Sequence, residues 1–188
     1  MDRTAIFIDG AYLDKLLDHE FGRARIDYGA FAKELAQGTE ILRTYYYHCP
    51  PYQSNPPTED ERRRTSSKNR FFTALSSLSR FQVRLGKLAF RGLNQQGAPI
   101  FVQKRVDIML GVDMVQLAAT RQITRAVLLA GDSDFVPALE IVKQHGVLVV
   151  LWHGPRGPMN NNTVHHELWD AADDRFVLTR ALLTGVAR

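Results

Sequence analysis

The chain of 188 residues contains a single cysteine, Cys49, which excludes an internal disulfide and any cysteine-based zinc site of the usual spacing. No window of about 18 apolar residues occurs, so we expect no membrane-spanning segment. The first residues lead directly into an apolar run and lack the layout of a signal peptide. A glycine-rich phosphate loop of the Walker type is also absent, which argues against a nucleotide-driven motor. A reducing, cytoplasmic location is the simplest expectation.

Acidic residues are missing from one long stretch. Between Arg62 and Val106 the chain has 11 Lys or Arg residues and no Asp or Glu, whereas the remainder holds 13 basic and 20 acidic residues. Such a basic segment favours a surface that binds a polyanion such as nucleic acid, and an Arg-rich insertion that only aids solubility is the alternative. The residues predicted to contact nucleic acid are Arg62, Arg63, Arg64, Lys68, Arg70, Lys104 and Arg105.

Short apolar runs alternate with helical patterns along the chain. Strands are expected at 4–8, 41–47, 81–85, 126–130, 147–151 and 176–178, and helices around 12–17 and at 27–36, from 59 onward, and at 106–120, 135–144 and 165–171. Fully apolar strands separated by helices are typical of a parallel sheet that is covered on both faces. We therefore predict an α/β protein, a three-layer α/β/α sandwich with a mostly parallel central sheet, in a single domain over residues 1–188.

The basic stretch is predicted to form a helical and hairpin excursion at about 58–105. Thr58 is the expected N-cap of its helix, and three acids follow it in the first turn. The apolar positions of this helix should face the core and its cations should face outward; the apolar positions are Phe71, Phe72, Leu75 and Leu78. The glycine-containing segment 86–99 is predicted to be either irregular or a hairpin.

Acidic residues stand where the parallel strands are expected to end. Asp9 directly follows the first strand, Asp132 and Asp134 follow the strand at 126–130, and Asp107 opens a helix. Because strands of a parallel sheet end at a common edge, these carboxylates should meet in one crevice. Two like charges 4 Å apart cost roughly 4 kcal/mol at an effective dielectric constant of 20, so a shared proton or a cation must compensate. Oxygen-only ligand sets select Mg²⁺ or Mn²⁺, although each acid could instead be a turn or cap residue.

Asp113 is a different kind of acid. It lies six residues after Asp107, about 9 Å further along a helix, and its helical neighbours are apolar. We interpret Asp113 as a structural acid with a buried partner, with direct metal binding as the alternative. Lys104 and Arg105 could neutralise the acids, bind a substrate phosphate, or be solvated surface charges.

Other polar and aromatic groups are weaker candidates. His165 and His166 could bind a metal ion, but a surface position is the favoured interpretation. Residues 45–48 could line the crevice or alternate between core and surface, and Cys49 lacks an identified base. Three phenylalanines could stack on nucleobases or pack in the core: Phe71, Phe81 and Phe90.

Three blocks together resemble a known family. They are residues 6–13, residues 104–107 with Asp113 and Met114, and residues 129–137, which include Gly131-Asp132-Ser133-Asp134-Phe135. These blocks and the stretch 172–176 are similar to the LabA-like branch of the NYN domain family. In two places the chain departs from the family pattern, since Tyr12 stands where many relatives have Asn and Arg105 where Gly is frequent.

The resemblance implies a PIN-like, Rossmannoid sandwich and a metal-dependent ribonuclease site. By this resemblance, the acidic positions of the family correspond to Asp9, Asp107, Asp132 and Asp134, with Asp113 as a further position. The leading hypothesis is hydrolysis of RNA phosphodiester bonds with Mg²⁺ or Mn²⁺. The alternatives are a non-catalytic, RNA-binding regulatory module and a small phosphoesterase. RNA is the expected partner, DNA is an alternative nucleic acid, and a homodimer is compatible with the sequence.

Overall fold

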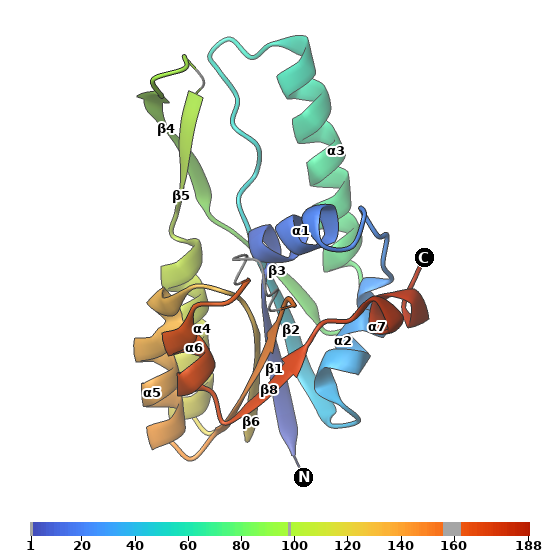
Figure 1. Ribbon diagram of the computed structural model, residues 1–188, viewed down its shortest axis with the longest axis vertical. Helices are drawn as coiled ribbons and strands as arrows, with labels where there is room; N and C mark the ends of the chain where they lie inside the picture. Colours follow the sequence, from blue (N-terminus) through green and yellow to red (C-terminus); the bar gives the residue numbers. More distant parts are fainter. Residues whose placement is uncertain (1, 98, 156–162) are drawn as a thin grey trace.

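A computed structural model describes residues 2–97, 99–155 and 163–188 (Figure 1). Its centre is a six-stranded sheet in the order β3-β2-β1-β6-β7-β8, and every neighbouring pair of strands is parallel. The strands are β1 (Arg3–Asp9), β2 (Glu40–His48), β3 (Phe81–Leu85), β6 (Arg125–Leu129), β7 (Leu148–His153) and β8 (Asp174–Val177). The predicted parallel sheet is confirmed.

Helices cover both faces of this sheet (Figure 1). One face packs against α4 (Val106–Ala119), α5 (Val136–Gln144) and α6 (His166–Ala171), and the other against α1 (Gly10–His19), α2 (Tyr28–Ala36) and α7 (Arg180–Gly185). Alternate residues of β1 enter the two cores, which explains why the strand is apolar throughout: Phe7 belongs to the first core and Ile6 to the second. The predicted α/β/α sandwich is therefore confirmed.

The basic stretch forms a long helix and a hairpin. The helix α3 (Glu59–Ser76) begins at Thr58, whose side chain caps it in a reciprocal capping box with Glu61, as the sequence predicted for the cap. The strands β4 (Lys87–Leu93) and β5 (Pro99–Lys104) pair in antiparallel fashion as a separate two-stranded sheet. The hairpin and the first turns of α3 project beyond the body of the molecule (Figure 1). Of the two predicted alternatives for 86–99, the hairpin is correct.

Two features differ from the prediction. The last strand, β8, begins at Asp174 rather than at residue 176, and the short helix α7 was not predicted. Helix α7 has six residues and buries Leu183. A helix this short cannot display a repeated apolar period in its sequence. No helix within the described ranges is both long and apolar enough to cross a membrane.

Candidate active site

The acids gather where the winding of the sheet reverses. From β1 the chain builds β2 and β3 on one side, and it later returns to build β6, β7 and β8 on the other, so β1 and β6 are neighbours. Asp9 is the last residue of β1, and Asp132 follows the end of β6 by three residues. In open α/β sheets the crevice at this switch point is the usual binding site.

Asp9 is held in a fixed orientation by the helix that follows it. It is the N-cap of α1, and its Oδ1 accepts hydrogen bonds from the amides of Ala11 (3.0 Å) and Tyr12 (3.1 Å). Burial raises the pKa of Asp9 to about 6; the Tyr12 hydrogen bond opposes this shift and the charge of Asp107 adds to it. Asp9 is thus a cap residue and also a member of the acidic group.

Two glycines allow the strand ends to approach their neighbours closely. A Cβ atom on Gly10 would lie 2.5 Å from the ring of Tyr46. A Cβ atom on Gly131 would lie 2.5 Å from the ring of Tyr12 and 2.6 Å from the carbonyl oxygen of Thr163. Each glycine adjoins one of the acids, so close backbone packing fixes the positions of Asp9 and Asp132.

The other acids belong to the same electrostatic group. Asp132 caps a short 3₁₀ turn (Ser133–Phe135), with its Oδ1 accepting from the amide of Asp134 at 3.1 Å. The pKa of Asp107 is raised, first by partial burial and then by the charges of Asp132 and Asp134. Within the described ranges none of the four acids forms an ion pair. None of these acids is therefore held by a direct cationic partner, and an oxygen-only donor set of this kind suits a hard divalent cation.

The four acids border two hollows. One, of about 980 Å³, contains Asp9 and Asp132, and the other, of about 1140 Å³, contains Asp107 and Asp134 together with Lys104 and Arg105. Besides partial burial, the charge of Asp132, in the first hollow, raises the pKa of Asp107, in the second. The single predicted crevice thus corresponds to two hollows at one edge of the sheet.

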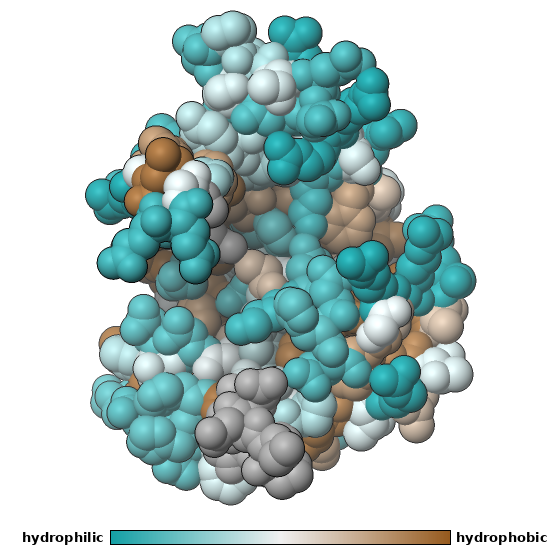
Figure 2. Space-filling model, turned by 45° about the horizontal axis from the view of Figure 1, so that its top comes forward, coloured by the Kyte–Doolittle hydropathy of each residue, from teal (hydrophilic) through white to brown (hydrophobic). Residues whose placement is uncertain are grey.

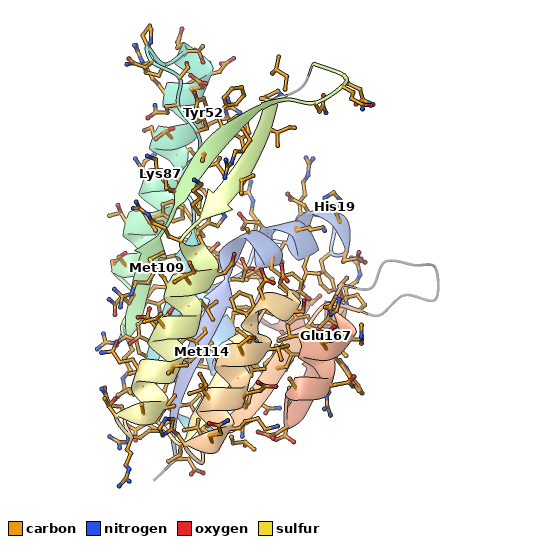
Figure 3. All side chains as sticks on the ribbon, turned by 90° about the vertical axis from the view of Figure 1, so that its left-hand side faces the viewer. His19, Tyr52, Lys87, Met109, Met114 and Glu167 are labelled. Atoms are coloured by element: carbon orange, nitrogen blue, oxygen red, sulfur yellow. The ribbon has the colours of Figure 1, made fainter. Side chains whose placement is uncertain are left out.

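A different trio has the closest ligand atoms. Among the described residues, one group of three side chains has possible metal-ligand atoms that all lie within 4.8 Å of one another: His165, His166 and Glu167. All three are exposed at the start of α6, where Figure 3 labels Glu167. No three of the four aspartates meet this distance within the described ranges. The surface position predicted for the two histidines is correct, whereas Glu167, their neighbour in the sequence, was not among the predicted candidates.

Asp113 has partners that account for its charge. The hydroxyl of Tyr47 donates a hydrogen bond to its Oδ2 at 2.8 Å, and Arg84 lies 3.1 Å from the same oxygen and 3.2 Å from Oδ1. These contacts support the structural interpretation of Asp113. We therefore leave it out of the metal-binding set.

Lys68 does not extend into solvent as predicted. Its ammonium group lies 2.6 Å from Asp14 Oδ2, which is also 3.0 Å from His48 Nε2, and it sits over the ring of Phe71 at 5.1 Å. This position ties α3 to α1, and its charge is already balanced by an acid from outside the basic stretch. The outward orientation predicted for Lys68 is wrong.

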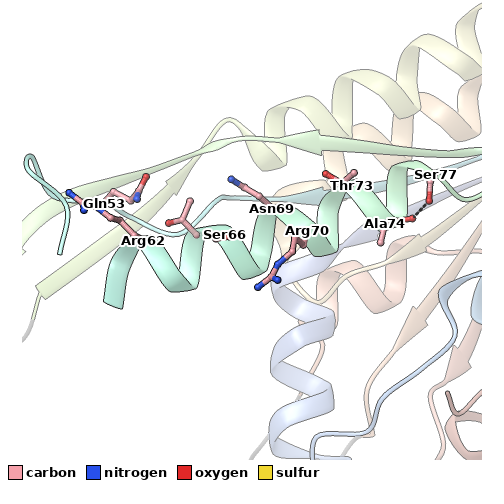
Figure 4. Close-up of a pocket in the computed structure, with 9 residues that line it drawn as sticks. Gln53, Arg62, Ser66, Asn69, Arg70, Thr73, Ala74 and Ser77 are labelled. Carbon is pink, nitrogen blue, oxygen red and sulfur yellow. Dashed lines mark hydrogen bonds between the residues drawn. The ribbon is translucent and has the colours of Figure 1, made fainter. Parts of the chain in front are cut away.

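The arginines of α3 point in different directions because successive helical residues are about 100° apart. Arg62 and Arg70 line a hollow of about 670 Å³ along the polar face of the helix (Figure 4). Arg63 pairs with Glu59 at 2.6 Å, whereas Arg64 faces the hairpin. The exposed cations do not form one face, and their contacts with nucleic acid remain a prediction.

The remaining candidates are mostly core residues. Tyr46 and Tyr47 are fully buried, and burial raises the pKa of the Cys49 thiol, which argues against a nucleophile. Phe81 is buried, whereas Phe90 is 47% exposed on the hairpin.

Comparison with known proteins identifies a family. The model of the NYN domain family matches residues 3–179. A curated relative, the uncharacterized protein y4oD of Sinorhizobium fredii, is 36% identical over 87 residues, which cover 45% of this chain and 36% of that protein. The chain thus spans little more than a third of that relative.

Solved structures agree on the fold. A protein of unknown function from Vibrio parahaemolyticus superposes with a TM-score of 0.63 at 20% identity, covering 95% of this chain and 93% of the other. The catalytic domain of the CheB methylesterase from Thermotoga maritima gives a TM-score of 0.43 at 14% identity, covering 98% and 96% of the two chains, which is too weak a likeness for a functional argument.

The family match includes all of the acidic positions, the whole of the first core and most of the second. NYN domains are part of the PIN-like superfamily of nuclease folds, and the parallel sheet with helices on both faces agrees with that architecture. The assignment to the LabA-like branch stays a prediction. The chain belongs to the NYN domain family.

Proposed function

We propose that this protein is a metal-dependent ribonuclease that hydrolyses phosphodiester bonds of RNA. The observation that carries the proposal is the gathering of acids from separate segments, without ion-pair partners among the described residues, at the switch point between β1 and β6. Repulsion within such a group is costly unless a cation joins it. Membership of a nuclease superfamily supports hydrolysis as the reaction.

The residues that would hold Mg²⁺ or Mn²⁺ are Asp9, Asp107, Asp132 and Asp134. All four offer carboxylate oxygens, and Asp9 keeps Oδ2 clear of its cap hydrogen bonds, which both go to Oδ1. A bound divalent ion supplies a water of lowered pKa and positive charge near the scissile phosphate. These two effects are what hydrolysis of a phosphodiester requires.

Other residues of the chain would bind and orient the substrate. Lys104 and Arg105 are exposed beside Asp107 and Asp134 in the same hollow, where they can contact phosphate oxygens. Tyr12 accepts a hydrogen bond from the amide of Gly154 at 2.9 Å, and so holds the chain after β7 against the site. Tyr12 therefore has a positioning role where many relatives have Asn.

The decisive experiment compares the wild type with Asp132→Asn on labelled RNA. Single-stranded and structured RNA are incubated with Mn²⁺, Mg²⁺ or a chelator, and products are separated on a gel. We expect cleavage by the wild type only with added metal, and no cleavage by Asp132→Asn, which keeps the size and the cap of the side chain. Asp170→Asn, an exposed aspartate of α6, is the matched control and should remain active.

Intact RNA under every condition would contradict the nuclease proposal. It would favour the second candidate, a non-catalytic RNA-binding module, which is supported by the wide spacing of the aspartate oxygens. A parallel assay with a small phosphate ester distinguishes the phosphoesterase alternative, which predicts turnover of that ester. Single-stranded DNA, added as a further arm, tests which nucleic acid is the substrate.

A further inference from the structure

An aromatic cluster joins the hairpin to the linker that precedes α3. Phe90 and Phe101 face each other across the β4–β5 pair with ring centroids 5.9 Å apart. The ring centroid of Tyr52, in the linker, lies 4.9 Å from that of Phe101 and 6.1 Å from that of Phe90. Figure 3 labels Tyr52 beside the hairpin. Three rings from three segments therefore meet on one face of the hairpin.

This cluster is open to solvent. Phe90 is 47% exposed and Phe101 is 38% exposed, so both rings are accessible to a ligand. The rings line a hollow of about 520 Å³, which we call the hairpin hollow, and this volume is in the usual range for small-ligand sites. In Figure 2 hydrophobic residues gather on the projecting part of the molecule, beside a depression in the surface.

The hairpin hollow has one acid and one base in its lining. Glu61 accepts hydrogen bonds from Ser54 Oγ (2.6 Å) and the amide of Thr58 (2.8 Å), which lower its pKa and keep it ionised. These bonds tie the carboxylate of Glu61 to the linker and the cap of α3. Arg64 forms no ion pair with any described residue, so its guanidinium group can contact a phosphate.

The opposite face of the hairpin carries unpaired cations as well. Lys87 and Lys104 are directly opposite each other in the register, and both are exposed. Like charges in this position destabilise a hairpin, and neither lysine has an acidic partner within the described ranges. A polyanion bound to this face would relieve the repulsion, but the two lysines do not line the hairpin hollow itself.

We infer that the hairpin hollow binds an unpaired nucleobase of single-stranded RNA, with the base against Phe90 and Phe101 and a phosphate on Arg64. An exposed aromatic ring can stack on any nucleobase. The bases of a duplex already stack on one another, so only an unpaired base offers a free face to the ring. Strand β5 leads from Phe101 to Lys104 over about 10 Å and enters α4 just before Asp107, so RNA held here lies on the segment that leads to the acids. This inference rests on the proposed function for the identity of the ligand.

The test measures RNA binding by fluorescence anisotropy in the presence of a chelator, so that no cleavage occurs. Phe90→Ala should weaken binding of a single-stranded oligonucleotide by roughly 5- to 150-fold, the range that loss of one stacked base predicts. Leu93→Ala is the matched control, since Leu93 is 63% exposed on the same strand and does not line the hollow. It should change binding by less than about twofold, and blunt duplex RNA should show little difference between the variants.

Phe90→Tyr keeps the ring and should bind like the wild type, which separates stacking from a loss of folding. An oligonucleotide containing 2-aminopurine gives an independent readout, because stacking on a ring quenches its fluorescence. Unchanged affinity or unchanged quenching with Phe90→Ala would overturn the inference. So would a wild-type dimer that Phe90→Ala converts to a monomer without loss of RNA affinity, because the hollow would then be a protein interface.

The two proposals fail separately. Binding with chelator that depends on Phe90, together with no cleavage in any metal, would refute the nuclease and keep the stacking site. Metal-dependent cleavage with no effect of Phe90→Ala on binding would support the nuclease and refute the stacking site.

Discussion

The hydroxyl of Tyr47 donates a 2.8 Å hydrogen bond to Oδ2 of Asp113, joining the end of β2 to the middle of α4. Arg84 from β3 pairs with the same carboxylate, so three elements meet at one acid. The carboxylate also raises the pKa of Tyr47, after burial as the larger cause, and this keeps the hydroxyl protonated as the donor. The arrangement is a structural tie next to the candidate site.

Asp113→Asn should therefore lower stability and spare catalysis. Loss of the charge weakens the contact with Arg84, so we expect the free energy of unfolding to fall by about 1–3 kcal/mol, and by about 1 kcal/mol for Tyr47→Phe. Metal-dependent RNA cleavage by the folded variant should stay close to that of the wild type. Denaturant titration measures the expected loss of stability, and the gel assay measures the expected retention of RNA cleavage. If Asp113→Asn were as inactive as Asp132→Asn while still folded, Asp113 would belong to the metal-binding set.

Asp9→Asn should stabilise the metal-free protein at neutral pH. The pKa of Asp9 is about 6 in the fold against an ordinary value of 3.8, so the ionised carboxylate opposes folding. This cost is complete above about pH 6, declines as the pH falls, and is absent below about pH 4, where the group is neutral in both states. Asn keeps the cap of α1 and removes the charge, so the gain should be about 1–3 kcal/mol at pH 7.5.

Denaturant titrations of both proteins with chelator, at pH 7.5 and pH 3.5, check this prediction. The stability difference should vanish at the lower pH. An equal difference at both values would show that Asn acts through packing and not through charge. Added Mg²⁺ should stabilise the wild type and not Asp9→Asn.

Gly131→Ala should damage the site through the backbone. The new Cβ would lie 2.5 Å from Tyr12 and 2.6 Å from the carbonyl oxygen of Thr163, so the chain that carries Asp132 must shift. We expect a loss of about 1–3 kcal/mol in the free energy of unfolding and a large loss of cleavage. Gly185→Ala is the control, since a Cβ there meets nothing within 4 Å. It should keep full activity, and equal damage by both substitutions would contradict the packing argument.

Arg105→Gly should weaken RNA binding without a loss of stability. Arg105 has a φ of 77°, in the left-handed region that favours glycine, at the N-cap position of α4. Glycine adopts this φ without strain, which stabilises the folded protein by about 1 kcal/mol. This gain offsets the loss of stability that comes from the greater freedom of glycine in the unfolded chain. Lys104→Gly removes the same charge from a β5 residue with ordinary backbone, so no unfavourable φ is relieved there. Glycine weakens the strand, and we expect this cost to outweigh the lost repulsion with Lys87 and to destabilise the hairpin.

Thermal unfolding and anisotropy distinguish these two variants. Both should bind RNA more weakly and show a smaller salt dependence of binding. If both substitutions destabilised the protein equally, the left-handed conformation of Arg105 would not lower the stability of the wild type. The glycine that is frequent at this position in relatives would then need another explanation.

Local sequence patterns determined much of this protein. Apolar runs such as Ala126–Ala130 predicted buried parallel strands, because a strand covered on both faces has no polar side. Thr58 with Glu61 fixed the start of α3, since a cap depends only on residues within one turn. The order of strands and acids along the chain was enough to place Asp9 and Asp132 at one edge of the sheet.

Only the tertiary structure decided which charges are free. Lys68 is paired with Asp14, 54 residues away, and Asp113 with Arg84, 29 residues away, whereas Arg64 and Lys104 keep no acidic partner among the described residues. The aromatic cluster of Tyr52, Phe90 and Phe101 likewise joins three segments. A local pattern reports helical or strand period, but pairing between distant side chains depends on how the elements pack, which no short stretch of sequence contains.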